Sequence, residues 1–203
     1  MPPQHKAHPW HGLQLGEQAP DVVTAFIEIV PTDTVKYEID KESGYLKIDR
    51  PQLYSNIVPA LYGFLPRTYC DRHIAKLASE LTNQQVAEGD GDPLDILVLT
   101  EKVIPHGDII LQAIPIGGLC MIDKGEADDK IIAVLKNDAL YGKWRDLSDC
   151  PESILKRLRH YFLTYKAIPG EVNLVDVDTV YGREHAHKVI RTSMKDYEES
   201  FLQ

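Results

Sequence analysis

The sequence predicts a single domain over residues 1–203, of the mainly β (α+β) class. Short apolar segments recur between turn residues in the first two thirds of the chain, which is typical of a barrel or a sandwich. A clear amphipathic helix pattern begins only near residue 149. A chain of 203 residues is long enough for one domain with a sizeable core.

The expected strands are short runs rich in β-branched and aromatic residues, and they cover residues 22–30, 35–39, 45–49, 95–100, 108–116, 118–122 and 130–135. The sequence DKESG joins the second strand to the third and predicts a hairpin turn at Gly44. Alternation along the second strand places Lys36 and Glu38 on one face. Glu28 shares a face of the first strand with apolar residues, which is an unusual environment for a carboxylate without a partner.

Two helices are expected in the last third. In residues 149–166, Asp149 precedes Glu152 by three positions, which predicts a capping box, and Pro151 lies in the first turn. The apolar residues of this helix share one face, and they are Ile154, Leu155, Leu158, Tyr161, Phe162 and Tyr165. A second helix is expected within residues 183–202. Residues 65–89 form a long, insert-like connection, in which we expect a short helix.

Composition and charge narrow the functional classes. The net charge of −9 argues against a nucleic-acid surface, which should be basic. No apolar stretch approaches the ~20 residues of a membrane helix, and residues 1–20 lack the apolar segment of a secretory signal. Cys70, Cys120 and Cys150 have no C-x-x-C spacing, so we expect reduced thiols in a cytoplasmic protein.

The segment EGDGDPLDILVLTE, residues 88–101, places Asp90, Asp92 and Asp95 directly before an apolar run. Carboxylates this close repel one another unless water, basic side chains or metal ions compensate their charge. A solvated acidic turn is one interpretation. An EF-hand loop is excluded, because its sixth position requires glycine and this chain has Asp95 there. A phosphatase with an aspartate nucleophile would need an apolar strand before the cluster, whereas the preceding residues are polar.

A site for divalent metal at the start of a strand is the remaining interpretation, and all-oxygen ligands suit Mg²⁺ or Mn²⁺. A second acidic group supports it, since Asp123 and Asp128 lie in a loop between two expected strands and Lys130 begins the next. Alone, this loop would be a charged hairpin tip. Together, the two loops are what a centre with several metals needs, and nearby Lys, Arg and Tyr side chains could bind phosphate.

Several motifs occur in a fixed order: KYEIDKESG with KIDR, then DGDPLD, then D-x4-D-x-K ending at Lys130, and finally YK at 165–166. From about Phe26 to Lys166 the chain resembles the family I soluble inorganic pyrophosphatases. The resemblance implies a five-stranded, OB-like closed barrel with flanking α-helices. It also implies hydrolysis of pyrophosphate to two phosphates, with several Mg²⁺ ions per active site and Mn²⁺ as a substitute.

The resemblance also implies a role for each site residue. The metal ligands would be Asp90, Asp95, Asp123, Asp128 and Glu28, and Asp92 would be the general base. The substrate-binding residues would be Lys36, Glu38, Arg50, Tyr62, Lys130, Tyr165 and Lys166. Members of the family form hexamers or dimers, so a homo-oligomer is expected. Typical bacterial members carry tyrosine and asparagine where this chain has Val58 and Leu61, and their connection before the aspartates is shorter.

Two alternatives stay open from the residues alone. One is a metal-dependent phosphohydrolase that acts on another phosphoanhydride, which would want an apolar or aromatic pocket for an organic group. The other is a non-catalytic module that binds divalent cations, which leaves the basic residues without a purpose. The connection from Arg67 to Glu88 contains no residue that the chemistry requires, so it is expected to shape assembly or the rim of the site.

Overall fold

The computed structural model describes residues 5–166 and 175–202. Its strands are β1 (Val23–Ile29), β2 (Val35–Ile39), β3 (Leu46–Pro51), β4 (Leu61–Phe64), β5 (Glu88–Gly89), β6 (Asp95–Leu99), β7 (Ile109–Asp123), β8 (Glu126–Ala127), β9 (Lys130–Leu135) and β10 (Val175–Gly182). Its helices are α1 (Arg72–Thr82), η1 (Leu147–Asp149), α2 (Glu152–Thr164) and α3 (Arg183–Phe201). The expected mainly β class with helices late in the chain is confirmed.

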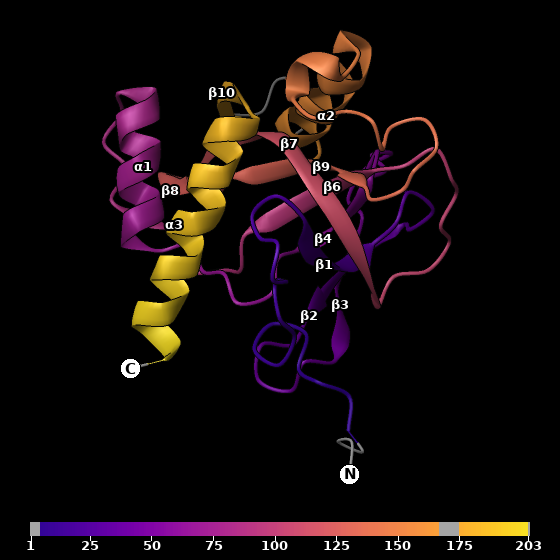
Figure 1. Ribbon diagram of the computed structural model, residues 1–203, viewed down its shortest axis with the longest axis horizontal. Helices are drawn as coiled ribbons and strands as arrows, with labels where there is room; N and C mark the ends of the chain where they lie inside the picture. The colour runs from indigo at the N-terminus through magenta and orange to yellow at the C-terminus, as the bar shows by residue number, and fades with distance from the viewer. Residues whose placement is uncertain (1–4, 167–174, 203) are drawn as a thin grey trace.

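Five strands close into a ring. The order of pairing is β1–β4–β6–β9–β7, and β7 pairs back with β1. The closed five-stranded arrangement implied by the resemblance is therefore confirmed. β8 and β10 extend the sheet from β7, whereas β2 and β3 form a separate hairpin (Figure 1).

The long strand β7 replaces the two strands expected at 108–116 and 118–122. Its pairing with β9 continues past a register shift between Pro115 and Gly117, which is a β-bulge. The bulge accommodates a proline that cannot donate to the ladder, so the strand bends without ending. The first half of β7 pairs with β1 and the second half with β10.

Strand β4 was not expected from the sequence, because it has only four residues and includes Gly63. A Cβ atom at Gly63 would lie 1.9 Å from the carbonyl oxygen of Phe26 on β1. Glycine is therefore needed for the close approach of these two strands. Strand β10 was also not expected; its backbone pairs antiparallel with β7.

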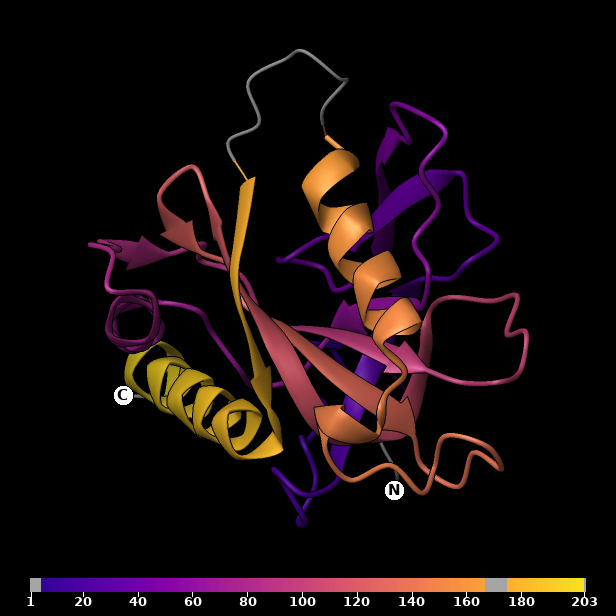
Figure 2. The ribbon, with the colours of Figure 1, turned by 90° about the horizontal axis from the view of Figure 1, so that it is seen from above.

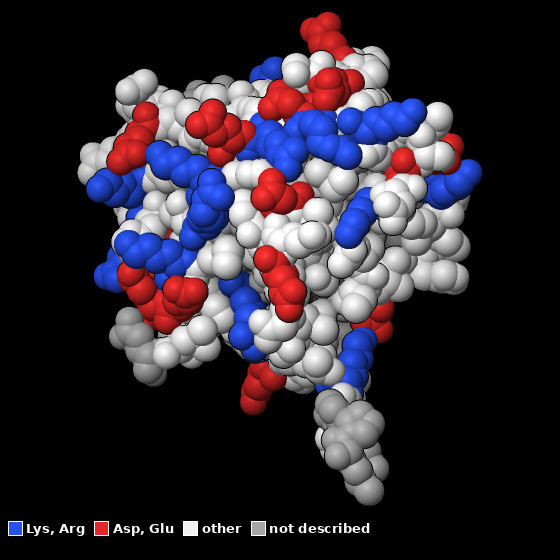
Figure 3. All heavy atoms as spheres, viewed as in Figure 1, with Lys and Arg blue, Asp and Glu red and all other residues white. Residues whose placement is uncertain are grey.

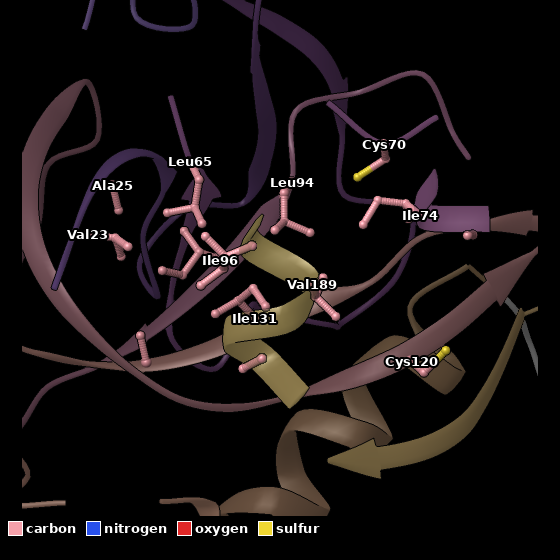
Figure 4. Close-up of a cluster of buried hydrophobic side chains, with 14 of the residues drawn as sticks. Val23, Ala25, Leu65, Cys70, Ile74, Leu94, Ile96, Cys120, Ile131 and Val189 are labelled. Carbon is pink, nitrogen blue, oxygen red and sulfur yellow. The ribbon is translucent and has the colours of Figure 1, made fainter. Parts of the chain in front are cut away.

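The main core lies between the strand ring and helices α1 and α3. Leu65, Leu94, Ile96, Ile131 and Val189 meet there, all almost completely buried (Figure 4). Figure 2 shows α1 and α3 side by side on one flank and α2 on the other. The short helix expected within 65–89 is thus confirmed as α1. Its inner face belongs to the core and is formed by Ile74, Ala75, Leu77 and Ala78.

The capping box predicted for α2 was wrong. Helix α2 begins after Pro151 and has no side-chain cap hydrogen bond. The box lies one turn earlier, in η1, where Asp146 accepts from Ser148 N at 3.0 Å and Asp149 accepts from Asp146 N at 3.2 Å. Cys150 precedes a proline, which disfavours helical geometry, and its extended backbone separates the two helices. The predicted apolar face is confirmed, with Leu158, Tyr161 and Phe162 buried.

The surface carries charges of both signs. Figure 3 shows basic and acidic side chains interspersed on the face that α1 and α3 cover, with no broad field of one sign. Mixed charges of this kind produce only a weak net field at a distance. None of the helices within 5–166 and 175–202 is long and apolar enough to cross a membrane.

Candidate active site

The β2–β3 hairpin carries the first group of predicted site residues. Lys36 Nζ lies 3.0 Å from Glu38 Oε2, so the shared strand face is confirmed, and 3.0 Å from Asp49 Oδ2. Arg50 is the register partner of Lys36, and its guanidinium lies 2.8 Å from Asp49 Oδ2. Burial alone would lower the pKa of Lys36, but Glu38 and Asp49 together raise it. The Lys36 ammonium therefore stays charged in a partly enclosed position.

Glu28 extends from β1 towards this hairpin and is buried. Its Oε1 accepts a hydrogen bond of 2.7 Å from Ile39 N. Burial raises the pKa of Glu28 to about 8, with further contributions from the nearby charges of Asp95 and Glu38. A cation beside this carboxylate would stabilise its charged form.

The loop Asp90–Asp92 turns sharply at Gly91, whose φ of +70° favours glycine. Its inner side is held by Cys70, which donates from its N to Asp92 O at 2.9 Å and accepts from Gly91 N at 3.0 Å. Asp92 N also donates to Asp90 Oδ1 at 3.1 Å. The backbone of the 65–89 connection thus supports the aspartate loop directly, although none of its side chains was predicted at the site.

Asp90 is surrounded by negative charge. Burial raises its pKa to about 9, and the neighbouring Asp128 and Asp95 add to the effect. Lys130 opposes the shift without abolishing it. In the absence of a further cation, this group of carboxylates has an excess of negative charge in a region of low solvent access.

Asp95 begins β6 and faces Lys130, the first residue of β9, in the parallel ladder. The Lys130 ammonium contacts both Asp95 and Asp128, and the side chain is only 3% exposed. Tyr62 on β4 donates from its hydroxyl to Asp95 Oδ2 at 2.5 Å. Burial would raise the pKa of Asp128, but the charge of Lys130 holds it below its usual range.

Asp123 ends β7, and Lys166 Nζ lies 2.5 Å from its Oδ2. The same ammonium lies 5.1 Å from the ring centroid of Tyr165, a cation–π contact. Asp123 Oδ1 is shielded from solvent and has no hydrogen-bond partner within the part of the chain that the structure describes. A shielded carboxylate oxygen without a partner is a position where a cation would be stabilised.

Most of the predicted residues form one contiguous group. A polar cavity is lined by Glu28, Lys36, Glu38, Ile39, Lys41, Tyr62, Phe64, Asp92, Pro93 and Asp95. Asp95 connects it through Lys130 to Asp128 and Asp90. Arg50 and Tyr165 do not line this cavity. The two departures from the resemblance, Val58 and Leu61, are buried apolar side chains in the core.

Divalent metal is the group that the site's chemistry suggests, and the donors fit it in type. They are all hard oxygen atoms, which Mg²⁺ prefers. No three such side chains in the described ranges converge on a single point. The Lys130 ammonium lies between Asp95 and Asp128 where the carboxylates would otherwise approach one another. The raised pKa of Asp90 and the unpartnered Asp123 Oδ1 both indicate uncompensated negative charge, so the residues fit a bound cation.

Sequence reasoning missed three residues near the site. Asp49 pairs with Lys36, and Lys41 contacts Asp92 across the cavity. Asp129 is 4% exposed, and it accepts a hydrogen bond of 2.7 Å from the hydroxyl of Tyr181 on β10. Asp49 lies next to Arg50 within the motif KIDR, and this position could have indicated it. The other two depend on contacts between distant segments, which leave no local signal.

A ring of five strands beside interleaved carboxylate, lysine and tyrosine side chains is the arrangement expected of an enzyme that acts on phosphate compounds. The family model for inorganic pyrophosphatase matches residues 25–198. An inorganic pyrophosphatase of Chlamydia muridarum is 50% identical over 200 residues, 96% of each chain. Soluble inorganic pyrophosphatase 2 of Chlamydomonas reinhardtii is 40% identical, over 97% of this chain and 91% of that protein.

Solved structures agree. The crystal structure of inorganic pyrophosphatase from Thermus thermophilus aligns with a TM-score of 0.78 at 30% identity, over 95% of this chain and 99% of that one. An inorganic pyrophosphatase from Helicobacter pylori aligns at 0.74 and 32% identity, over 92% and 98% of the two chains. The chain belongs to the inorganic pyrophosphatase family. As a member it is a hydrolase, an inorganic diphosphatase.

Proposed function

We propose that the chain hydrolyses inorganic pyrophosphate to two phosphates, with several Mg²⁺ ions per active site and Asp92 as the general base. Mn²⁺ is the expected substitute for Mg²⁺. The observation that carries the proposal is the contiguous group around Asp95, in which buried carboxylates alternate with Lys130 and Tyr62. The family membership supplies the substrate, and the hard oxygen ligands support the choice of metal.

When bound by Asp90, Asp95, Asp123, Asp128 and Glu28, Mg²⁺ supplies acidification of a water molecule and compensation for the charge of pyrophosphate. Asp92 is the carboxylate of the loop best suited to accept a proton from an attacking water. Its side chain lines the cavity and is 45% exposed, whereas Asp90 and Asp95 are more enclosed. A base must reach its proton directly or through one water, and this position allows it.

The phosphate groups gain charge as the bridging bond breaks, and donors must compensate them. Lys36, Arg50, Lys130 and Lys166 can do so with ammonium and guanidinium groups, and Tyr62 and Tyr165 with hydroxyl groups. Glu38 has a supporting role, because its carboxylate orients Lys36 at 3.0 Å. Without cations the excess of carboxylates would repel the anionic substrate.

Most residues that line the cavity are charged, which disfavours a larger organic phosphate. The described chain has an apolar cavity, lined in part by Leu61, Val98, Val103, Tyr141 and Ile154, but it contains none of the proposed site residues. Release of phosphate from pyrophosphate, with ATP as the comparison substrate, tests the proposal. Turnover of pyrophosphate but not ATP supports it. Equal turnover of both favours a broader phosphohydrolase, and turnover of neither favours a cation-binding module.

We further propose that residues 1–203 act as one domain and assemble into a homo-oligomer, either a hexamer or a dimer. Large exposed apolar side chains support assembly, among them Tyr45, Ile48, Leu53, Ile57 and Val103. Sedimentation equilibrium would measure the stoichiometry. A cytoplasmic location is proposed because Cys70, Cys120 and Cys150 are all thiols, which suits a reducing compartment.

A further inference from the structure

The turn between β2 and β3 is held in a fixed position against the N-terminal segment. His8 Nε2 lies 3.2 Å from Lys41 O. Gly44 has a φ of +72°, and a Cβ atom there would lie 2.8 Å from atoms of His8 and Pro9. Within the turn, Asp40 Oδ1 accepts from Ser43 N at 2.9 Å. The backbone of Lys41 is therefore anchored, and its side chain starts from a defined point beside the cavity.

The Lys41 side chain reaches from this turn to the aspartate loop. Its ammonium donates to Gly91 O at 3.2 Å and contacts Asp92 Oδ1. Asp92 Oδ1 is shielded from solvent and accepts no other hydrogen bond from the described residues, although the Asp92 side chain as a whole is 45% exposed. Lys41 thus covers one carboxylate oxygen, and the exposure comes from the rest of the side chain.

The loop is consequently held from both sides. Cys70 binds the backbone of Gly91 and Asp92 on the inner side, and Lys41 binds Gly91 O and the Asp92 carboxylate on the cavity side. An exposed ion pair alone would contribute little to folding. A carboxylate held through one oxygen beside the cavity can instead present its other oxygen to a water within hydrogen-bond reach, which general base catalysis needs.

We propose that Lys41 is a positioning residue for Asp92, which it holds in the orientation needed to accept a proton, and that it does not itself bind substrate. The inference rests on the proposed function, because it assumes that Asp92 is the general base. It goes beyond that function by assigning a task to a residue of the hairpin turn. Small misplacements of a reacting group can reduce turnover by up to about a hundredfold.

The test compares Lys41→Gln with Lys47→Gln in the full-length enzyme. Lys47 lies on the same hairpin and is 49% exposed against 47% for Lys41. Its ammonium lies 3.9 Å from Asp40 Oδ2, whereas Asp40 Oδ1 closes the turn, so its ion pair is separate from the aspartate loop. We expect Lys41→Gln to lower kcat roughly tenfold with KM for pyrophosphate unchanged, since positioning acts on the chemical step. Lys47→Gln should leave both constants unchanged. Lys41→Arg should restore most of kcat, and urea unfolding should confirm that all variants fold.

A double-mutant cycle completes the test, because Lys41→Gln should have no further effect in an Asp92→Asn background. Additive losses would overturn the inference, as would a raised KM with kcat intact, which would make Lys41 a phosphate ligand. Identical behaviour of Lys41→Gln and Lys47→Gln would also overturn it. Asp92→Asn measured alone tests the proposed function separately. Wild-type turnover in that variant would show that Asp92 is not the general base, whatever the role of Lys41.

Discussion

Lys130 and Asp95 lie opposite each other at the first residues of two parallel strands, and the ammonium of Lys130 contacts both Asp95 and Asp128. The register of β6 against β9 therefore delivers a buried cation to the centre of the carboxylate group. The charges of Asp128 and Asp95 raise the pKa of Lys130 despite the opposing effect of burial. This residue stays charged and compensates two acids at once.

Removal of this cation should destabilise the protein. Lys130→Met leaves the buried Asp128 and the partly buried Asp95 uncompensated, and breaking such a buried pair typically costs about 3–5 kcal/mol. Mg²⁺ should recover part of this loss, because it can take the place of the missing positive charge. Urea unfolding with and without Mg²⁺ measures both effects.

Lys102→Met is the matched control, since Lys102 is 73% exposed and its partner Glu101 lies 3.2 Å away. Its free energy of unfolding should change by less than about 0.5 kcal/mol. Equal stability of the two variants would show that Lys130 is not the counter-ion of the buried acids.

The strands that the sequence predicted well are those with a simple pattern. β1, β2, β6 and β9 are continuous apolar or alternating runs, and each lies within a residue or two of its expected bounds. β4 was missed because Gly63, which lowers strand propensity, is required there by the approach of Phe26. Packing against a neighbouring strand decided that element, and such packing is not visible in a local pattern.

In the active site, too, local patterns could be predicted and contacts between distant segments could not. The spacing of Asp90, Asp92 and Asp95 indicated a cluster of carboxylates because all three lie in one short loop. The contact of Lys41 with Asp92 could not be predicted, because it joins a hairpin turn to a loop that is distant in the sequence. Roles for single residues came from the family resemblance, and only measurements on variants can test them.

Replacement of Mg²⁺ by Ca²⁺ should nearly abolish turnover. The proposed ligands are hard oxygens that can bind either ion, but Ca²⁺ accepts longer and more variable coordination than Mg²⁺. The reacting groups would therefore be held in the wrong positions. Phosphate release in Mg²⁺, in Ca²⁺ and in excess chelator provides the measurement. Full activity in Ca²⁺ alone, or with all divalent ions chelated, would contradict the metal requirement.

Asp138 should stabilise the protein in a pH-dependent way. Its carboxylate accepts hydrogen bonds from Tyr141 N at 2.8 Å, Thr100 Oγ1 at 2.7 Å, Glu101 N at 2.9 Å and Leu140 N at 3.0 Å. Burial would raise the pKa of Asp138, but these bonds lower it. The stabilisation is therefore complete above the unfolded pKa of about 3.9, and it is lost as pH falls through the lower folded value.

Asp138→Asn replaces one carboxylate oxygen with an NH2 group, which cannot accept hydrogen bonds from its two donors. The free energy of unfolding should therefore fall by about 2 kcal/mol at pH 7. The difference from the wild type should shrink below about pH 4. Asp21→Asn is the control, because Asp21 is 69% exposed and its change should be small at every pH. Thermal unfolding followed from about pH 3 to 7 tests the expectation. A stability difference that grows in acid would contradict a lowered pKa for Asp138.

The roles proposed for the aspartates can be separated by two substitutions. Asp92→Asn keeps the size of the side chain but cannot accept a proton, so it should reduce turnover by about 10²–10⁴-fold, the usual contribution of a general base. Its affinity for Mg²⁺ should be nearly unchanged. Asp95→Asn removes a charge from a proposed ligand, so Mg²⁺ affinity should fall first. High Mg²⁺ should then restore part of its activity, because mass action refills the weakened site.

Titration with Mg²⁺ by calorimetry, beside steady-state hydrolysis, distinguishes the two roles. Asp95 pairs with Lys130, so Asp95→Asn also removes one of the two charged partners of that ammonium. Unfolding curves should therefore establish that both variants are folded before affinities are compared. Loss of Mg²⁺ binding in Asp92→Asn together with normal binding in Asp95→Asn would mean that the roles are reversed. Undiminished hydrolysis in both variants would mean that the loop is only a solvated acidic turn, because neither carboxylate would then contribute to the chemistry.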